Sequence, residues 1–261
     1  MSLALGATWN PRGELTRFQR LLPELETVYS GIAISFPPQA NPEVVAQVKE
    51  AVRIKAFVNP EWSWGRRSAL EAAVKTGATH VQYADFDRLL RWAETRPEEW
   101  RRIAVEIERH DCLVIGRTSA AYSTHPQALI QTEAISNRVV SYLLGKRVDA
   151  SAGSKGFNCR AVRFLLANTR PERALGTDAE WPVLLMRAGF EIDVIEVDGL
   201  DWESADRYQE NSASAQAQAR AAQAYDKDPG NWEYRASVAM EIVQCGLDAM
   251  ERELVYPNEA E

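Results

Sequence analysis

The chain has 261 residues, of which 46% are hydrophobic and 26% charged, and its formal net charge is −7. These values are ordinary for a globular protein of one large domain or two smaller ones, and the acidic balance gives no support to nonspecific binding of nucleic acid or of an anionic membrane. The cysteines offer neither a zinc cluster nor a disulfide framework, and no stretch resembles a signal peptide or reaches about 18 apolar residues. We therefore expect a cytoplasmic protein without a nucleic-acid partner or an integral membrane segment.

Short apolar segments alternate with amphipathic ones along the first half of the chain. The predicted strands are Leu3–Thr8, Val28–Ser35, Lys55–Val58, Thr79–Asp85 and Cys112–Gly116. The predicted helices between them are Glu14–Leu22, Pro42–Val52, Arg66–Thr76 and Pro97–Arg109. This alternation is typical of an α/β fold with a mainly parallel sheet covered by helices, in which ligands bind at the carboxyl ends of the strands.

The second half of the chain continues with longer helical patterns. In chain order we predict a helix over Pro126–Leu144, a small-residue loop over Ala150–Gly156, helices over Ala161–Asn168 and Ala179–Ala188, a strand over Phe190–Val197, and helices over Ser212–Tyr225 and Trp232–Glu253. The composition shifts to Ala, Gln and Ser after the polar segment 201–208, which is placed to cover a site as a lid. We interpret residues 1–208 as one α/β domain and residues 209–261 as a C-terminal helical extension packed on it.

Two carboxylates, Asp85 and Asp87, stand one residue apart where the predicted strand Thr79–Asp85 ends. Side chains two residues apart share a face of an extended chain, so both reach one ligand if the backbone stays extended through Phe86. Mg²⁺ and Mn²⁺ prefer oxygen ligands and often bind between carboxylates and substrate phosphates. The motif is short, and its second copy, Asp226–Asp228, lies in a polar Pro-Gly turn, so a solvated turn is the competing interpretation. The position of the first copy in the strand–helix alternation favours a metal site.

The segment Thr177-Asp178-Ala179-Glu180 is a second acidic cluster, at the start of a predicted helix. Thr177 and Glu180 fit a capping box, which is the interpretation we favour from the residues alone. A carboxylate at this position, Asp178 or Glu180, is alternatively suited to act as the general base for an acceptor hydroxyl.

Basic residues stand at two places that suit a phosphate. Gly65 and Arg66 open a predicted helix, where backbone amides and a guanidinium favour a diphosphate, although arginines on a solvated helix face explain the pattern equally well. Lys155 is flanked by glycines in the predicted loop 150–156, from which it reaches a phosphate or an acceptor, or serves solubility alone.

The order of these motifs resembles a known family. Taken together, Asp85-Phe86-Asp87, Gly153-Ser154-Lys155-Gly156-Phe157, Thr177-Asp178-Ala179-Glu180 and Arg187-Ala188-Gly189-Phe190-Glu191-Ile192 are similar to the motifs of nucleotide-sugar-dependent glycosyltransferases of the GT-A fold, a Rossmann-like fold. The resemblance is greatest to the family-2-like and polyprenyl-phosphate sugar transferases, and it covers roughly residues 3–208.

The resemblance implies roles for particular residues. Asp85 and Asp87 would bind a divalent metal, Mg²⁺ or Mn²⁺, and the nucleotide-diphosphate sugar, while Asp178 or Glu180 would act as the base if the reaction inverts the sugar. The residues implied in binding the nucleotide sugar are Thr8, Trp9, Asn10, Gly65, Arg66, Asp85 and Lys155. The chain departs from the family at residues 7–11, where members usually carry a Pro-x-x-Asn-Glu type strand end. We also see no hydrophobic C-terminal anchor of the kind that many lipid-phosphate sugar transferases carry, which favours a soluble or a loosely associated acceptor.

We therefore expect a metal-dependent enzyme that transfers a sugar from a nucleotide-diphosphate donor to an unidentified acceptor. A sugar nucleotidyltransferase is the nearest enzymatic alternative, but the sequence lacks the Gly-x-Gly-x-Arg loop that such enzymes normally carry after the first strand. A catalytically silent nucleotide-sugar-binding protein is the alternative from another class. Homo-oligomerisation is compatible with the sequence.

Overall fold

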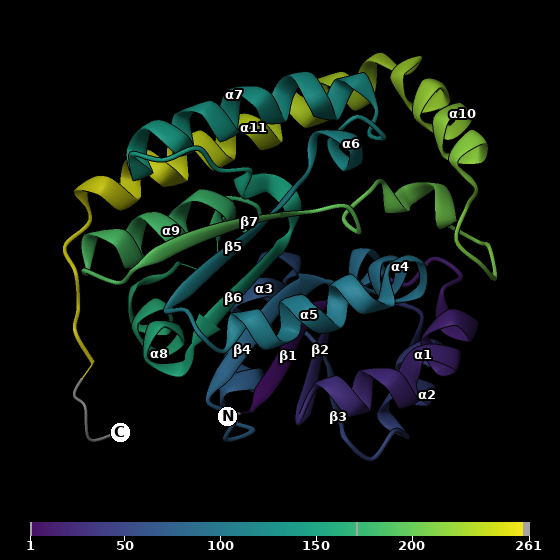
Figure 1. Cartoon of the computed structure of the whole chain (residues 1–261), viewed down its shortest axis with the longest axis horizontal. Coiled ribbons are helices and arrows are strands. Elements are labelled where there is room, and N and C mark those ends of the chain that lie inside the picture. Colours follow the sequence, from purple (N-terminus) through teal and green to yellow (C-terminus); the bar gives the residue numbers. More distant parts are fainter. Residues whose placement is uncertain (1, 171, 258–261) are drawn as a thin grey trace.

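The computed structural model describes residues 2–170 and 172–257. Met1, Pro171 and the last four residues of the predicted extension 209–261 lie outside the described part. Figure 1 shows a central sheet with helices on both faces, and one pair of long helices lying across one side of the molecule.

A seven-stranded sheet runs through the molecule in the order β3-β2-β1-β4-β6-β5-β7. Its strands are β1 (Leu3–Thr8), β2 (Gly31–Phe36), β3 (Ile54–Val58), β4 (His80–Asp85), β5 (Cys112–Arg117), β6 (Ser154–Asn158) and β7 (Ile192–Val197). Strand β6 is antiparallel to both of its neighbours, β4 and β5, whereas the other strand pairs are parallel. The predicted α/β class with a mainly parallel sheet is confirmed.

Helices cover both faces of this sheet. The α-helices are α1 (Leu15–Val28), α2 (Pro42–Lys49), α3 (Gly65–Val74), α4 (Phe86–Thr95), α5 (Pro97–Ile107), α6 (Ser119–Tyr122), α7 (Gln127–Leu144), α8 (Cys159–Asn168), α9 (Thr177–Arg187), α10 (Ala215–Asp226) and α11 (Pro229–Glu251). Three short 3-10 helices are η1 (Trp62–Trp64), η2 (Ala150–Ala152) and η3 (Glu203–Asp206). In the described residues no helix is long and apolar enough to cross a membrane.

Alternate residues of the strands supply two separate hydrophobic cores. In β1, Leu5 and Ala7 enter the core shared with α1, α4 and α5, while Ala4 enters the core on the other face, shared with α3, α8 and α9. Gly6 also faces α3, and a Cβ atom there would lie 2.8 Å from the carbonyl oxygen of Ala69. The sheet and α3 therefore approach closely, which places the N-terminus of α3 beside the carboxyl end of β1.

Helix α1 is longer than predicted because it continues through a proline. The sequence prediction ended the helix at Leu22, before Pro23, yet the helix extends to Val28. Pro23 lies on the exposed side, whereas Leu21 and Leu25 are buried against the sheet. Burial of these side chains outweighs the loss of one backbone hydrogen bond at the proline.

The loop predicted over residues 150–156 is wrong, since Ser154–Asn158 forms the antiparallel strand β6. This segment carries Lys155 and Gly156 and lacks the alternation of a half-exposed strand. Its side chains are buried on both faces, so its polar residues are satisfied by tertiary partners instead of by water.

Candidate functional site

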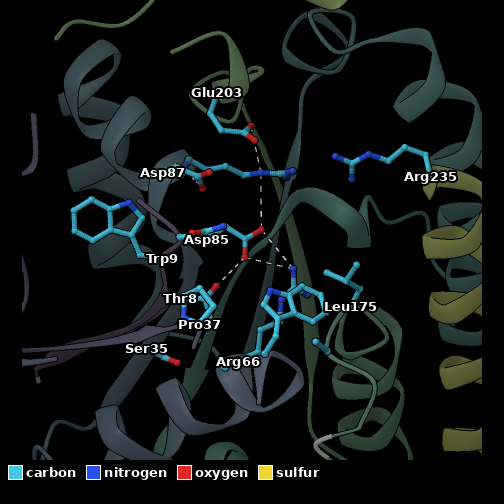
Figure 2. A pocket seen from close by; sticks show the side chains of 15 residues that line it. Thr8, Trp9, Ser35, Pro37, Arg66, Asp85, Asp87, Leu175, Glu203 and Arg235 are labelled. Carbon is cyan, nitrogen blue, oxygen red and sulfur yellow. Dashed lines mark hydrogen bonds and ion pairs between the residues drawn. The ribbon is translucent and has the colours of Figure 1, made fainter. Parts of the chain in front are cut away.

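A pocket of about 200 Å³ opens at the carboxyl ends of β1, β2 and β4 and at the N-terminus of α3 (Figure 2). It is lined by Thr8, Trp9, Asn10, Ser35, Pro37, Trp62, Gly65, Arg66, Asp85, Asp87, Arg88, Ala174, Leu175, Glu203 and Arg235. Seven of the residues predicted from sequence are among them, from three segments that are far apart in the chain: Thr8, Trp9, Asn10, Gly65, Arg66, Asp85 and Asp87. The sheet topology brings them together because β1 lies between β2 and β4.

Asp85 and Asp87 both line the pocket, but the backbone between them is not extended as predicted. Asp85 is the last residue of β4 and the N-cap of α4, so the backbone turns into the helix at Phe86 and does not stay extended. Phe86 is fully buried among the aromatic residues of the core and anchors the start of the helix. Asp87 therefore lies in the first turn of α4, where the helix dipole favours a negative charge.

The Asp85 carboxylate is held by hydrogen bonds before any ligand arrives. Its Oδ1 accepts a 2.7 Å hydrogen bond from the Tyr83 hydroxyl and a 3.4 Å hydrogen bond from the Thr8 hydroxyl. Arg66 Nη2 lies 3.4 Å from the same oxygen, and Arg88 Nε lies 3.9 Å from Oδ2. Burial and the nearby Asp85 charge raise the pKa of Tyr83 well above its usual value, although Arg66 opposes them, so the phenol stays a donor.

Gly153 has no side chain, and the Asp85 carboxylate occupies the space that a side chain there would fill. It has a left-handed conformation with φ of +74°, and a Cβ atom there would lie 2.5 Å from Asp85 Oδ2. Its carbonyl oxygen accepts a 3.0 Å hydrogen bond from the Asp85 backbone amide. The glycine of the Gly153–Phe157 motif thus meets both the conformational and the steric demand of the strand end.

Arg66 joins the pocket to a buried ionic cluster. Its Nη1 donates 2.9 and 3.0 Å hydrogen bonds to Asp178 Oδ1 and to the hydroxyl of Thr177. Lys155 Nζ approaches the same Asp178 oxygen at 2.8 Å. Burial acts to lower the pKa of Arg66, but Asp178, Tyr83 and Asp85 outweigh it and raise the pKa, so the guanidinium is charged.

The remaining predicted residues lie behind the pocket or away from it. Lys155, expected in a mobile loop, is almost fully buried on β6 and does not line the pocket. Asp178 is buried between Arg66 and Lys155, and these cations lower its pKa despite the opposing effect of burial. Glu180 pairs with Arg252 at 2.6 Å and lines a different cavity. Neither predicted base therefore lines the pocket.

The capping box predicted at Thr177 is wrong. The N-cap of α9 is Gly176, and no side chain caps this helix end. The Thr177 hydroxyl donates to the carbonyl oxygen of Ala174, and it accepts the hydrogen bond from Arg66. The Thr177 side chain therefore hydrogen-bonds to Arg66 and to a backbone carbonyl, and does not cap the helix as the sequence pattern predicts.

Glu203 and Arg88 line the pocket but were not predicted as site residues, although the predicted lid 201–208 includes Glu203. Glu203 lies on η3 and is 8% exposed, and its Oε2 accepts no hydrogen bond although Arg88 Nε lies 3.4 Å away. Figure 2 shows the Glu203 carboxylate directed toward Asp87 and Asp85 from the opposite wall. Burial and the carboxylates of Glu203 and Asp85 raise the pKa of Asp87 to about 7.

Trp62 and Arg235 were also missed, for different reasons. Trp62 is 47% exposed at the rim of the pocket, close in sequence to the predicted Gly65 and Arg66. Arg235 comes from α11, within the predicted extension, and Figure 2 shows its side chain directed toward the pocket from that helix. Trp9 was predicted and lines the pocket, but its side chain is buried in the core, where its ring lies 5.5 Å from that of Phe18.

The segment 201–208, predicted as a lid, is an anchored wall of the pocket. Arg91 forms 2.7 Å ion pairs with both Asp201 and Asp206. Arg17 of α1 lies 3.0 Å from Asp206. These largely buried pairs fix η3, which carries Glu203, to α1 and α4.

The pocket offers few protein ligands for a metal ion. Among the described residues, no group of three or more His, Cys, Asp or Glu side chains is placed to hold a metal ion. Asp85 and Asp87 are two carboxylates in one pocket, and Mg²⁺ is commonly held by one or two carboxylates together with substrate phosphates. The two carboxylates could therefore hold a divalent metal only if other ligands completed its coordination. No protein-family model matches the sequence, and no curated protein matches it either.

Proposed function

We propose that the pocket binds a nucleotide-diphosphate sugar together with Mg²⁺ or Mn²⁺ and that the protein is a glycosyltransferase with a GT-A-like fold. The observation that carries the proposal is the convergence of Thr8, Gly65, Arg66, Asp85 and Asp87 at one end of a mainly parallel sheet. Such a position is where α/β sheets bind nucleotides. The motif order that resembles glycosyltransferases supplies the reaction type.

The charges of the pocket support a diphosphate over a neutral ligand. Arg66 stands in the first turn of α3, where a helix N-terminus favours an anion, and Arg88 and Arg235 add two more guanidinium groups. Asp85 and Asp87 would hold the metal, which neutralises charge on the diphosphate as it leaves. Gly65 permits close approach, because its position has no side chain between Thr8 and the helix start.

We assign Asp178 a positioning role and Glu203 the role of base. The Asp178 carboxylate orients Arg66 and is saturated by two cations, which makes it a poor proton acceptor. Burial raises the pKa of Glu203, but Arg88 outweighs it and lowers the pKa, as the cations do for Asp178. Unlike Asp178, Glu203 lines the pocket and has an oxygen without a hydrogen-bond donor, so it is placed to accept the proton of an acceptor hydroxyl. Glu180 lies in another cavity and has no part in this scheme.

The donor assignment is tested by thermal shift with UDP-, GDP-, CDP- and dTDP-sugars, each with and without Mn²⁺. At least one sugar nucleotide is expected to raise the melting temperature in a metal-dependent way, because ligands that bind only the folded state stabilise it. Asp87→Asn should abolish that shift. Asp228→Asn is the matched control from the second Asp-x-Asp copy, since asparagine also caps a helix and Asp228 caps α11 away from the pocket. A metal-dependent shift for none of the four donors would contradict the proposal.

Turnover is tested by release of nucleoside diphosphate from the donor that binds. The wild-type protein should hydrolyse that donor slowly with Mn²⁺, and faster once a suitable acceptor is present. With the acceptor, Glu203→Gln should keep the thermal shift but slow transfer by about 10²-fold or more, as expected for loss of a general base. Binding without any release of nucleoside diphosphate would identify a silent binding protein, and an unchanged rate in Glu203→Gln would remove Glu203 from the role of base.

A further inference from the structure

Three arginines line the pocket, and two of them already have carboxylate partners. Arg66 lies 3.4 Å from Asp85 and 2.9 Å from Asp178, and Arg88 likewise pairs with two carboxylates. The third is Arg235, which comes from α11. In the described part of the chain no carboxylate oxygen lies within 4.0 Å of its nitrogen atoms. An anion that enters the pocket therefore finds Arg235 without a competing carboxylate.

The neighbours of Arg235 order its side chain without neutralising it. Its Nε donates a 3.0 Å hydrogen bond to the hydroxyl of Tyr225 on α10, and its guanidinium carbon lies 5.4 Å from the centre of the Tyr234 ring. The residues three and four positions away on α11 are its neighbours along the helix, and all are uncharged: Asn231, Trp232, Val238 and Ala239. Neither Nη group hydrogen-bonds to the described residues, and such a planar fork of donors suits the two oxygens of a carboxylate or a phosphate.

Arg235 reaches the pocket from the side opposite the first strands. Helix α11 packs on α7 and α9, and Figure 1 shows α7 and α11 on the side of the molecule away from β1–β3. In Figure 2, Arg235 and Trp9, which follows β1, lie on opposite sides of Asp85. Although Arg235 adds to the positive charge that favours a diphosphate, the proposed donor residues Thr8 and Arg66 stand on β1 and α3. The side of Arg235 is therefore left for the acceptor.

Glu203, the base that we propose for the acceptor hydroxyl, shares this side of the pocket with Arg235. Both residues line the pocket, and Figure 2 shows both side chains directed into it. Burial raises the pKa of Glu203, but nearby arginines lower it, Arg88 more than Arg235. The charge of Arg235 thus acts on the space in front of the Glu203 carboxylate. A group that contacts Arg235 there belongs to the molecule whose hydroxyl faces Glu203.

We propose that the acceptor carries an anionic group, a carboxylate or a phosphate, beside its reacting hydroxyl, and that Arg235 binds this group. The inference rests on the proposed function, because it needs the donor and the base in place. In the transfer, the acceptor oxygen forms a bond to the anomeric carbon of the donor. The bond from that carbon to the donor phosphate breaks, its electron pair leaves with the nucleoside diphosphate, and the hydroxyl proton passes to Glu203. Arg235 holds the anion so that the hydroxyl lies near both the anomeric carbon and Glu203.

Two matched series of acceptors test this assignment, with the donor that gives the metal-dependent thermal shift. Glycerol is compared with glycerol 3-phosphate and glycerate, and glucose with glucose 6-phosphate and glucuronate, so that the phosphate and carboxylate arms are separate. Transfer is measured as acceptor-dependent release of nucleoside diphosphate. At least one anionic acceptor should exceed its neutral counterpart in kcat/KM by about 10- to 100-fold, the range for a hydrogen bond to a charged group.

Substitution of Arg235 should remove this preference. In Arg235→Gln the ratio of kcat/KM between the anionic and the neutral acceptor should fall to near one, while the donor still gives a metal-dependent thermal shift. Arg235→Lys should recover part of the ratio, because lysine keeps the charge but lacks the planar fork. Arg220→Gln is the matched control, since Arg220 is exposed on α10 and does not line the pocket. Circular dichroism establishes that each variant is folded before its kinetics are measured.

The outcomes separate this inference from the proposed function. Loss of the donor shift in Arg235→Gln would place this arginine on the diphosphate and overturn the inference alone. Donor binding without a preference for any anionic acceptor, or an unchanged preference in Arg235→Gln, would do the same. A wild-type protein that shows no donor shift would contradict the proposed function, and this inference with it.

Discussion

Arg66 combines a structural role with a role in the pocket. It is 7% exposed, yet it contacts Asp85 on the pocket side and Asp178 on the side of α9. Its guanidinium also lies 5.4 Å above the Tyr83 ring. Because an arginine held from several sides loses little further freedom on binding, Arg66 presents an ordered cation to an incoming anion.

Removal of the Asp178 charge tests this buried cluster. In Asp178→Asn the buried cations Arg66 and Lys155 lose their shared carboxylate, so the free energy of unfolding should fall by about 3–5 kcal/mol, as for a broken buried ion pair. Urea denaturation measures the change. Glu71→Gln is the control, because its partner Lys75 is well exposed and such surface pairs contribute about 0–1 kcal/mol. Equal losses in the two variants would contradict the structural role of Asp178.

At the scale of single elements, His110 links α5 to strand β7. Its Nδ1 lies 2.7 Å from Asp193 Oδ2 on β7, and its Nε2 lies 3.2 Å from Glu106 Oε1 on α5. Burial acts to lower the pKa of His110, but its hydrogen bonds to Asp193 and Glu106 outweigh burial and raise it. When protonated, the ring therefore joins the edge strand β7 to α5 through these two carboxylates.

This link predicts a pH dependence of stability. A raised pKa in the folded state means that the stabilisation by His110 is complete below its unfolded pKa of about 6.5 and is lost as the pH rises through its folded pKa. The melting temperature should therefore fall over that interval by more in the wild type than in His110→Gln. Thermal unfolding in a series of buffers at constant ionic strength compares the two proteins. Parallel profiles would show that His110 does not contribute.

The elements and part of the site are predictable from sequence because they depend on local patterns. Asp85, Arg66 and Thr8 line one pocket since strand ends and helix starts meet at one edge of a parallel sheet, whatever the details of packing. The side-chain direction of Trp9 and the burial of Lys155 depend on partners far away in the chain, and no local pattern encodes them. Strand β6 and the C-terminal part of α1 were missed for the same reason, since tertiary burial decides both.

At the scale of the whole molecule, buried ion pairs connect the late part of the chain to the first helix. Asp206 Oδ1 accepts 2.7 Å hydrogen bonds from Arg91 of α4 and from the backbone amide of Ala213, and Oδ2 accepts one of 3.0 Å from Arg17 of α1. Nearby, the Tyr208 amide donates a 2.7 Å hydrogen bond to the carbonyl oxygen of Arg12. The wall that carries Glu203 is thereby joined to the loop after β1.

Asp206→Asn should therefore affect both stability and the pocket. Arg17 keeps Glu94 and Arg91 keeps Asp201 in this variant, so we expect a loss of about 1–3 kcal/mol in the free energy of unfolding, as for lost hydrogen bonds to charged groups. The thermal shift given by a bound sugar nucleotide should also decrease, because η3 is no longer fixed. Asp248→Asn, at an exposed ion pair with Arg173, is the control and should change neither quantity appreciably. If Asp206→Asn were destabilised but showed the same thermal shift with the sugar nucleotide as the wild type, the position of η3 would not affect binding.

The antiparallel strand β6 has a consequence for the order in which the protein folds. Strands β1 to β4 form one side of the sheet in a short stretch of sequence, but β5 joins them only through β6, which is made later. Contacts between distant parts of a chain form slowly, and domains begin to fold from the N-terminus during synthesis. On the ribosome, the half of the pocket at β1, β2 and β4 can therefore assemble early. Glu203 and Arg235 reach it only when synthesis is nearly complete, so a truncated nascent chain would present Asp85 and Asp87 without the groups that face them.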